Sequence, residues 1–271
     1  MGAAVQSRQA GSKPTYRAWH GGLDHDSGAS APKRLGWAHE GGRVVTTSLK
    51  GRDGMITLYG FKTIFEGGVG ETKDLRAQWA LEETGLPYRV HALDQLAGDL
   101  HSEAYSKISP FHQVPVIDDD GFILSESGAI VLYLAEKAGK LVPSDVQGRT
   151  RVTQWCFAAV ATIDPTFAAL DVVGIFDPQN HKLEGELRKL AARWLADLER
   201  RLADRTWIAC DDFTAADIMM AGVLRNVRKT DLFDPFPKTK AYRDRCFARP
   251  AWERALKMYA ERFGVSVGEI R

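Results

Sequence analysis

The sequence has little that would direct it to a membrane, a nucleic acid or a secretory route. Its 271 residues hold 36 basic and 35 acidic side chains, a net charge of +1, so neither nucleic acid nor an anionic membrane is favoured electrostatically. No stretch approaches the roughly 18 apolar residues of a membrane span, and residues 1–30 lack the apolar segment of a signal peptide. We therefore expect a cytoplasmic protein without either partner.

Cysteine is also scarce. The three cysteines, Cys156, Cys210 and Cys246, lie far apart and form no C-x-x-C, zinc or disulfide pattern. We expect no metal site, and a reducing cytoplasm fits this usage. The chain has 44% hydrophobic and 26% charged residues, which is the balance of a globular protein with one large or two ordinary domains.

Residues 1–54 lack apolar periodicity and contain ten glycines. Such a segment cannot bury enough surface to offset the entropy of ordering. We expect a disordered leader or a mis-assigned start, because Met55 opens the first strand-like run; a regulatory or targeting arm is the alternative.

Residues 55–138 alternate between strand and helix patterns. A glycine at Gly85, followed by Leu86-Pro87, ends the first helix. The expected order is a strand, a helix, a strand, a short helix, a hairpin around Asp120-Gly121 and a final helix; the first four are Ile56–Tyr59, Lys73–Thr84, Tyr88–Ala92 and about His101–Ser106.

The second half shows only helical periodicity. We expect a linker at 139–148, an all-helical domain at 149–265 and a tail at 266–271. The segment from Thr214 to Asp217 predicts a capping box, with aspartate in place of the usual glutamate. Asp217 is therefore expected to be structural rather than catalytic.

One stretch, Ser109 to Ala138, has the parts of a small-anion site. Pro115 cannot donate to a sheet, so it marks a strand edge or a bend, with a cis bond plausible, that exposes the backbone of Val114 to a short peptide. Ser127 is expected to be the N-cap of the next helix, whose N–H groups favour a carboxylate. Glu126 beside it is suited to receive an ammonium group.

These two motifs, P-F-H-Q-V-P-V and S-E-S-G-A-I, resemble the glutathione S-transferase family over about residues 55–265. The resemblance implies an α/β thioredoxin-like N-terminal domain plus an all-α C-terminal domain. It also implies glutathione as co-substrate, bound by His101, Gln113, Val114, Pro115, Glu126 and Ser127.

The residue that activates the thiol is harder to place. Alignment on R-A-Q-W-A-L-E-E puts Thr72 at the hydroxyl position of bacterial family members, whereas the plant-type register puts Glu71 there, and a carboxylate would repel a thiolate. Tyr59, at the end of the first strand, is the alternative catalytic residue, and Thr63 is a weaker one. A donor at a helix start would stabilise the thiolate, which is the nucleophile.

The resemblance implies a detoxifying transferase that conjugates glutathione to an apolar electrophile, acts as a homodimer and needs no metal. A non-catalytic glutathione- or partner-binding protein is one alternative. A glutathione-dependent reductase or peroxidase is another, although residues 55–138 contain no cysteine. The electrophile pocket is expected around Trp155, Phe157, Ala158 and Ile163.

Overall fold

The computed structural model describes residues 54–65 and 67–271. Apart from Gly54, the predicted leader lies outside the described residues. Strands occur only in the first part of the described chain, which also contains three helices. These elements are β1 (Ile56–Thr63), α1 (Asp74–Thr84), β2 (Tyr88–Asp94), α2 (Glu103–Ser106), β3 (Val116–Asp119), β4 (Phe122–Ser125) and α3 (Ser127–Ala138).

The four strands form one mixed sheet in the order β2-β1-β3-β4. β1 pairs in parallel with β2 and antiparallel with β3, which pairs antiparallel with β4. Ile56 and Leu58 join the main core with α1 and α3, whereas Tyr59 and Phe61 join a second cluster that contains Tyr105 of α2. Helices therefore cover both faces of the sheet, which confirms the expected thioredoxin-like half.

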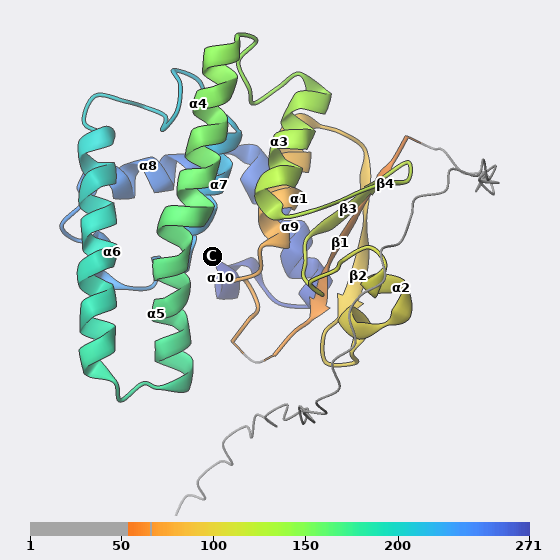
Figure 1. The fold of residues 1–271 in the computed structure, drawn as a ribbon, viewed down its shortest axis with the longest axis horizontal. Helices are drawn as coiled ribbons and strands as arrows, with labels where there is room; N and C mark the ends of the chain where they lie inside the picture. Colours follow the sequence, from red (N-terminus) through yellow and green to blue (C-terminus); the bar gives the residue numbers. More distant parts are fainter. Residues whose placement is uncertain (1–53, 66) are drawn as a thin grey trace, which may run out of the picture. The chain divides into compact units, whose positions relative to one another are not determined.

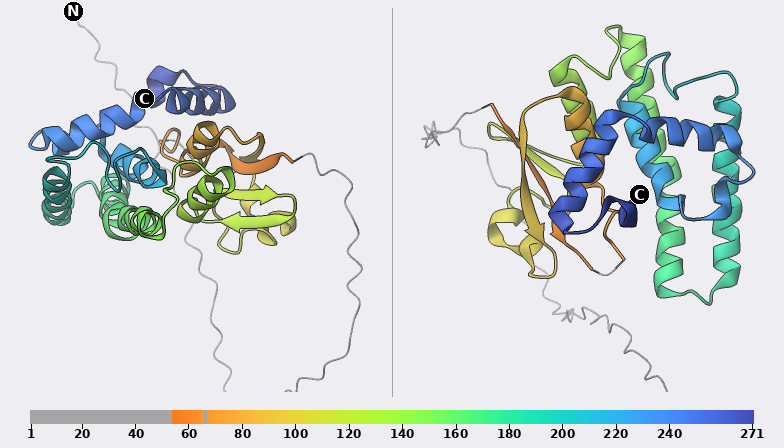
Figure 2. Two further views of the ribbon diagram at one scale, coloured as in Figure 1. Left: turned by 90° about the horizontal axis from the view of Figure 1, so that it is seen from above. Right: turned by 180° about the vertical axis from the view of Figure 1, so that it is seen from behind.

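The remaining described residues contain helices and no strand, as predicted. Figures 1 and 2 show most of these helices on the far side of α1 and α3 from the sheet, whereas the helix Pro250–Phe263 packs against both α1 and β1. Asp217 closes the expected capping box, and it also accepts hydrogen bonds from the Ile208 N–H (2.9 Å) and the Tyr242 hydroxyl (2.8 Å). The helices are α4 (Val146–Phe157), α5 (Asp164–Phe176), α6 (His181–Arg201), α7 (Ala215–Leu224), α8 (Pro237–Phe247), α9 (Pro250–Phe263) and α10 (Val267–Ile270).

A π-helical turn, Ala158–Ile163, joins α4 to α5 into one continuous helix, Val146–Phe176. With a mean hydropathy of 1.6 over its most apolar window, this helix is long and apolar enough to cross a membrane. This finding corrects the expectation that no stretch of the sequence approaches a membrane span. The finding rests on length and composition alone. The helix packs against α6 and α7, so part of its apolar surface serves the core of the helical domain.

Helix α1 is enclosed by the rest of the fold. Every residue from Asp74 to Leu81 is buried, because the helix packs against the sheet on one side and against α7 and α9 on the other. The ring of Trp79 lies 5.0 Å from that of Trp252 and 5.9 Å from those of Phe213 and Phe247. Aromatic pairs at these distances are favourable beyond the area they bury.

A buried ion pair fixes the first turn of α1 to α9. Arg262 Nη2 lies 2.6 Å from Asp74 Oδ2, and the same guanidinium donates to the Phe61 carbonyl (2.7 Å) and the Gln78 side chain (3.0 Å). Burial raises the pKa of Asp74, although Arg262 counteracts it. A buried carboxylate of this kind depends on its partner, since an unpaired buried charge is strongly unfavourable.

We predict that Arg262→Met lowers the free energy of unfolding by about 3–5 kcal/mol, because it leaves the Asp74 carboxylate buried and unpaired. Arg254→Met, also on α9, is the matched control: its partner is Glu82, its side chain is 54% exposed, and an exposed pair contributes about 1 kcal/mol or less. Urea denaturation of both variants measures the difference. Equal losses would contradict a special role for the buried pair.

Candidate functional site

A groove of about 620 Å³ lies between the strand-containing part and α4. Its walls come from four segments: the residue before α1, the loop before β3, the junction of β4 with α3, and the last turn of α4 with the π-turn. The lining residues are Lys73, Ser109, Pro110, Phe111, Gln113, Val114, Pro115, Ser125, Glu126, Ser127, Gly128, Ala129, Leu132, Cys156, Phe157 and Val160. The structure therefore brings Gln113, Val114, Pro115, Glu126 and Ser127 together.

Two hydroxyl groups hold the turn before β3 in place. Tyr105 Oη and Ser109 Oγ both donate to the Gln113 carbonyl, at 2.8 and 2.9 Å, and Ser109 Oγ accepts from the Gln113 N–H at 2.9 Å. The bond between Val114 and Pro115 is cis, as the position of the proline suggested. These hydrogen bonds fix the turn in which Val114 lines the groove.

The junction of β4 and α3 differs by one residue from the expectation. Glu126 occupies the N-cap position with φ 72° and ψ 115°, and Ser127 is the first helical residue instead of the cap. With Glu126 as the cap, α3 begins one residue earlier than a serine cap at Ser127 would place it. Within the described ranges neither side chain has a hydrogen-bond or ion-pair partner, although Ser127 is only 6% exposed. Both groups are therefore available to a ligand.

Thr72 does not line this groove. Its Oγ1 lies 2.6 Å from the Tyr259 hydroxyl, which also accepts from the Gly70 N–H at 3.2 Å. Burial and the Asp74 carboxylate raise the pKa of Tyr259, so its hydroxyl stays protonated and can donate to Thr72. In that arrangement the Thr72 hydroxyl can donate its own proton to an acceptor, and its hydrogen bond to the Asp74 carboxylate opposes the rise in the pKa of Asp74.

Glu71 turns away from the groove as well. Its carboxylate pairs with both terminal nitrogens of Arg228, at 2.8 and 2.6 Å. This bidentate contact neutralises the Glu71 carboxylate, which the plant-type alignment would have placed beside the thiol.

Lys73 is the residue of this segment that lines the groove, and the sequence analysis missed it. Its Nζ lies 3.0 Å from Asp164 Oδ2, and the same carboxylate accepts from Arg76 (3.2 Å) and Asn226 (3.0 Å). Burial raises the pKa of Asp164, but Arg76 and Lys73 outweigh it and hold the pKa below its ordinary value. An ionised Asp164 keeps the ammonium of Lys73 at the start of α1.

The remaining predicted residues are dispersed. Tyr59 lies on the other face of the sheet, with its ring 5.0 Å from that of His91. Burial, and then Asp118, raise its pKa. His101 ends a 3₁₀ turn beside His112, with 4.8 Å between the two rings, and does not line the groove.

Of the four residues expected in the electrophile pocket, Phe157 lines the groove and is 63% exposed. Trp155 lines a different pocket, Ile163 is buried in the core, and Ala158 borders neither pocket. Cys156, which the sequence analysis did not place here, lines the groove; burial and Asp217 raise the pKa of its thiol to about 12.

In residues 54–65 and 67–271 no group of three or more His, Cys, Asp or Glu side chains is placed to hold a metal ion. All three cysteines are free thiols.

Comparison with known proteins identifies the family. The glutathione S-transferase N-terminal domain model matches residues 75–142, and the C-terminal domain model matches residues 159–250. A glutathione S-transferase of Hyoscyamus muticus is 27% identical over 195 residues, which are 68% of this chain and 92% of the relative. The disulfide-bond oxidoreductase YfcG of Escherichia coli is 30% identical over 185 residues, covering 65% and 86% of the two chains.

A solved structure extends this likeness to three dimensions. The crystal structure of a glutathione transferase family member from Pseudomonas fluorescens, with two glutathione bound, matches with a TM-score of 0.67 and 27% identity over 74% of this chain and 92% of the other. The two family models, the mixed sheet with its adjoining helices and the groove beside the cis proline all indicate the same family. The chain belongs to the glutathione S-transferase family.

Proposed function

We propose that the protein is a glutathione transferase, which binds glutathione in the groove and activates its thiol for conjugation to an apolar electrophile. The observation that carries the proposal is the presence, in one groove, of three complementary groups: the Val114 backbone beside the cis proline and the free side chains of Glu126 and Ser127. A relative of known structure is described with glutathione bound.

In the proposed complex the tripeptide lies along the groove. The Val114 N–H and C=O pair with the cysteinyl backbone as an added strand would. The Glu126 carboxylate receives the ammonium group of the γ-glutamyl residue, and Ser127 with the first N–H groups of α3 receives its carboxylate, since a helix N-terminus favours an anion. Gln113 is placed to bind at the same turn. His101 is proposed to reach the glycine carboxylate from the edge.

The thiol is proposed to be activated at the start of α1. A free thiol with pKa about 8.5 is only about 3% thiolate at pH 7, and a fall of about two pKa units stabilises the thiolate by roughly 2.7 kcal/mol. Thr72 does not itself line the groove, but it is held by Tyr259 directly before Lys73, which does, and it is proposed to donate a hydrogen bond to the thiolate. The ammonium of Lys73, which lines the groove, adds a favourable charge. Tyr59 is disfavoured as the alternative, because it packs on the opposite face of the sheet.

The electrophile is proposed to be apolar and to enter beside α4. The groove wall there consists of Leu132, Phe157 and Val160, with Phe111 across from them. Phe111 and Phe157 are 75% and 63% exposed, so an apolar substrate would bury both rings. The expected roles of Trp155, Ala158 and Ile163 would then be to support this wall from behind.

A disulfide reductase is the second candidate function. It is favoured by the relative described as a disulfide-bond oxidoreductase and by Cys156 in the groove wall. In that reaction the Cys156 thiolate displaces one thiolate from a disulfide, a glutathione thiolate releases Cys156 from the resulting mixed disulfide, and a second glutathione thiolate displaces the remaining thiolate to give glutathione disulfide. A buried thiol with a pKa of about 12 is a poor nucleophile, so we expect conjugation to be the faster reaction.

A cytoplasmic homodimer that pairs through α3 and α4 is also proposed, since twofold pairing is the commonest assembly. Val146 on α4 is 70% exposed and Phe122 beside α3 is 50% exposed, so both are available to a second copy. Light scattering should then give twice the chain mass of 30.0 kDa.

We predict that Ser127→Ala and Glu126→Gln each weaken the binding of reduced glutathione by about tenfold or more, because each removes a hydrogen bond to a charged group. Ser106→Ala changes a half-buried serine on α2 that lies outside the groove and hydrogen-bonds within its own turn, and this variant should bind as tightly as the wild type. Titration calorimetry compares the three variants. Unchanged affinity in both groove variants would rule out the proposed binding mode.

We predict that Thr72→Val lowers kcat/KM with 1-chloro-2,4-dinitrobenzene by about tenfold or more, because the thiolate loses its donor. The pKa of bound glutathione, read from thiolate absorbance against pH, should rise toward that of the free thiol while its affinity stays unchanged. Tyr259→Phe, which removes the partner of the Thr72 hydroxyl and the acceptor of the Gly70 N–H but keeps Thr72 itself, should have a smaller effect. Full activity of Thr72→Val would disprove the assignment.

The same assays separate the candidate functions. If the wild type binds glutathione yet conjugates neither the chloronitrobenzene nor an isothiocyanate, the protein is a binding protein of the transferase fold or a reductase. Reduction of hydroxyethyl disulfide by the wild type and by Cys156→Ser then distinguishes those two. Loss of that reduction in Cys156→Ser would establish the cysteine as its nucleophile.

A further inference from the structure

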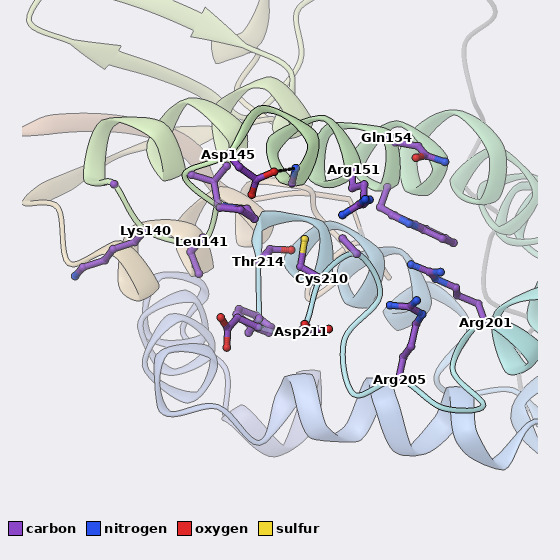
Figure 3. A pocket seen from close by; sticks show the side chains of 18 residues that line it. Lys140, Leu141, Asp145, Arg151, Gln154, Arg201, Arg205, Cys210, Asp211 and Thr214 are labelled. Carbon is purple, nitrogen blue, oxygen red and sulfur yellow. Dashed lines mark hydrogen bonds between the residues drawn. The ribbon is translucent and has the colours of Figure 1, made fainter.

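Among the described residues that line the groove, one side chain is cationic. Lys73 and Glu126 are the charged lining residues, and Glu126 is assigned above to the ammonium group of glutathione. Arg151 of α4 faces a separate pocket of about 860 Å³, which lies between α4, the end of α6 and the loop before α7 (Figure 3). The ammonium of Lys73 is therefore the positive charge that the groove can offer to a second substrate.

Lys73 connects the start of α1 with the start of α5. Its backbone is the N-cap residue of α1, directly after Thr72, whereas its Nζ lies 3.0 Å from Asp164 Oδ2. Asp164 follows Val160 by about one helical turn, and Val160 belongs with Phe157 to the apolar wall of the groove. The ammonium thus lies between the place proposed for the thiol and the wall proposed for the electrophile.

The carboxylate that holds Lys73 is shared between two cations. Asp164 also accepts from the Arg76 guanidinium (3.2 Å) and the Asn226 amide (3.0 Å). The side chains of Asp164 and Arg76 are 4% and 6% exposed, whereas that of Lys73 is 53% exposed. Lys73 therefore presents the excess positive charge at the surface of the groove. An ammonium group has three N–H donors, so the contact with Asp164 leaves donors for a substrate.

Conjugation moves negative charge from sulfur to the electrophile. When a thiolate adds to the β-carbon of an α,β-unsaturated ketone, a C–S bond forms, the C=C π-electrons shift, and the charge comes to lie on the carbonyl oxygen as an enolate. The α-carbon then takes a proton from water, and the remaining hydroxide is neutralised by the proton that the thiol released. Addition to a nitroarene ring places the charge on nitro oxygens in the same way. A donor fixed where charge develops stabilises the transition state.

We propose that Lys73 is a catalytic residue on the electrophile side of the reaction. Its ammonium donates to the oxygen that becomes negative as sulfur attacks, so the protein prefers apolar electrophiles whose reacting carbon is conjugated to a carbonyl or nitro group. Asp164 is the positioning residue that holds the ammonium in place. The inference rests on the proposed function, because it requires glutathione in the groove.

The test uses 1,3,5-trinitrobenzene, whose ring adds a thiolate and stops there because it carries no group that is readily expelled. The coloured adduct gives an equilibrium constant per thiolate at pH 9, where even an ordinary thiol with a pKa of about 8.5 is mostly ionised. We expect this constant to be about tenfold or more larger for glutathione on the wild-type protein than for free glutathione, because a charged donor meets the nitro oxygens. A constant no larger than that of free glutathione overturns the proposal.

The variant Lys73→Met separates two roles of the ammonium by the direction of its effect. If the ammonium follows the charge to oxygen, the adduct constant per thiolate falls by about tenfold or more. If the ammonium only stabilises the thiolate, its removal leaves a more basic and more nucleophilic sulfur, and the constant rises. A rise or an unchanged constant overturns the proposal. Asp164 keeps Arg76 and Asn226 as partners in this variant, so we expect the fold to persist, as circular dichroism will check.

Two further variants are controls. Lys73→Arg keeps a cation at the same place and should keep most of the effect. Lys137→Met, on α3 and outside the groove, removes a lysine that also pairs with a carboxylate, that of Asp119, and should form the adduct as the wild type does. Equal losses in Lys73→Met and Lys137→Met would contradict a local role for Lys73.

Turnover of trans-4-phenyl-3-buten-2-one tests the substrate class. We expect Lys73→Met to lower kcat/KM for this enone by about tenfold or more, because the enolate oxygen loses its donor, with the affinity for glutathione unchanged. If the wild type conjugates neither this enone nor 1-chloro-2,4-dinitrobenzene, the proposed function itself fails. If the wild type conjugates the enone and Lys73→Met does so equally well, the role of Lys73 alone is overturned.

Discussion

The enclosure of helix α1 is the constraint on which the rest of this structure depends. A helix that is buried on every side cannot shift without disturbing the sheet, α7 and α9 together. Asp74 is tied to Arg262 at its start, Arg76 to Asp164 beside it, and Trp79 to an aromatic cluster further along. The enclosure of α1 also fixes the groove, because the residue before α1 forms one of the groove walls and α4 forms another.

The sequence predicted the parts of the site that local chemistry determines. A proline between two valines, a tight turn at Asp120-Gly121 and the segment Ser125–Ser127 are local signals for a hairpin and a helix start, and the structure has both. The order of strands and helices and the all-helical second half followed from periodicity, and the resemblance to the family implied the thioredoxin-like fold. Ser127 was displaced by one position only because Glu126 adopts a left-handed conformation, which no local rule favours for glutamate.

The parts that sequence reasoning could not predict depend on distant residues. The partner of Thr72 is Tyr259, 187 positions away, and Glu71 is neutralised by Arg228, 157 positions away. Lys73 enters the groove because Asp164 holds it there, which required knowing where α5 begins. Periodicity showed that residues 149 onward are helical, but α4 has apolar residues on several faces, so it could not tell that Trp155 and Phe157 face different pockets.

The π-helical turn at Ala158–Ile163 has a consequence for the helix that contains it. A π-turn accommodates an extra residue, and each residue of a helix advances its side chain by roughly 100°. The turn therefore resets the angular phase between α4 and α5, so that Asp164 points at Arg76 and Lys73 while Arg151 keeps its own orientation upstream. Side chains before and after the turn can therefore point in directions that a regular α-helix would not allow. Deleting one residue within the turn would rotate the side chains of α5 by roughly 100° relative to those of α4.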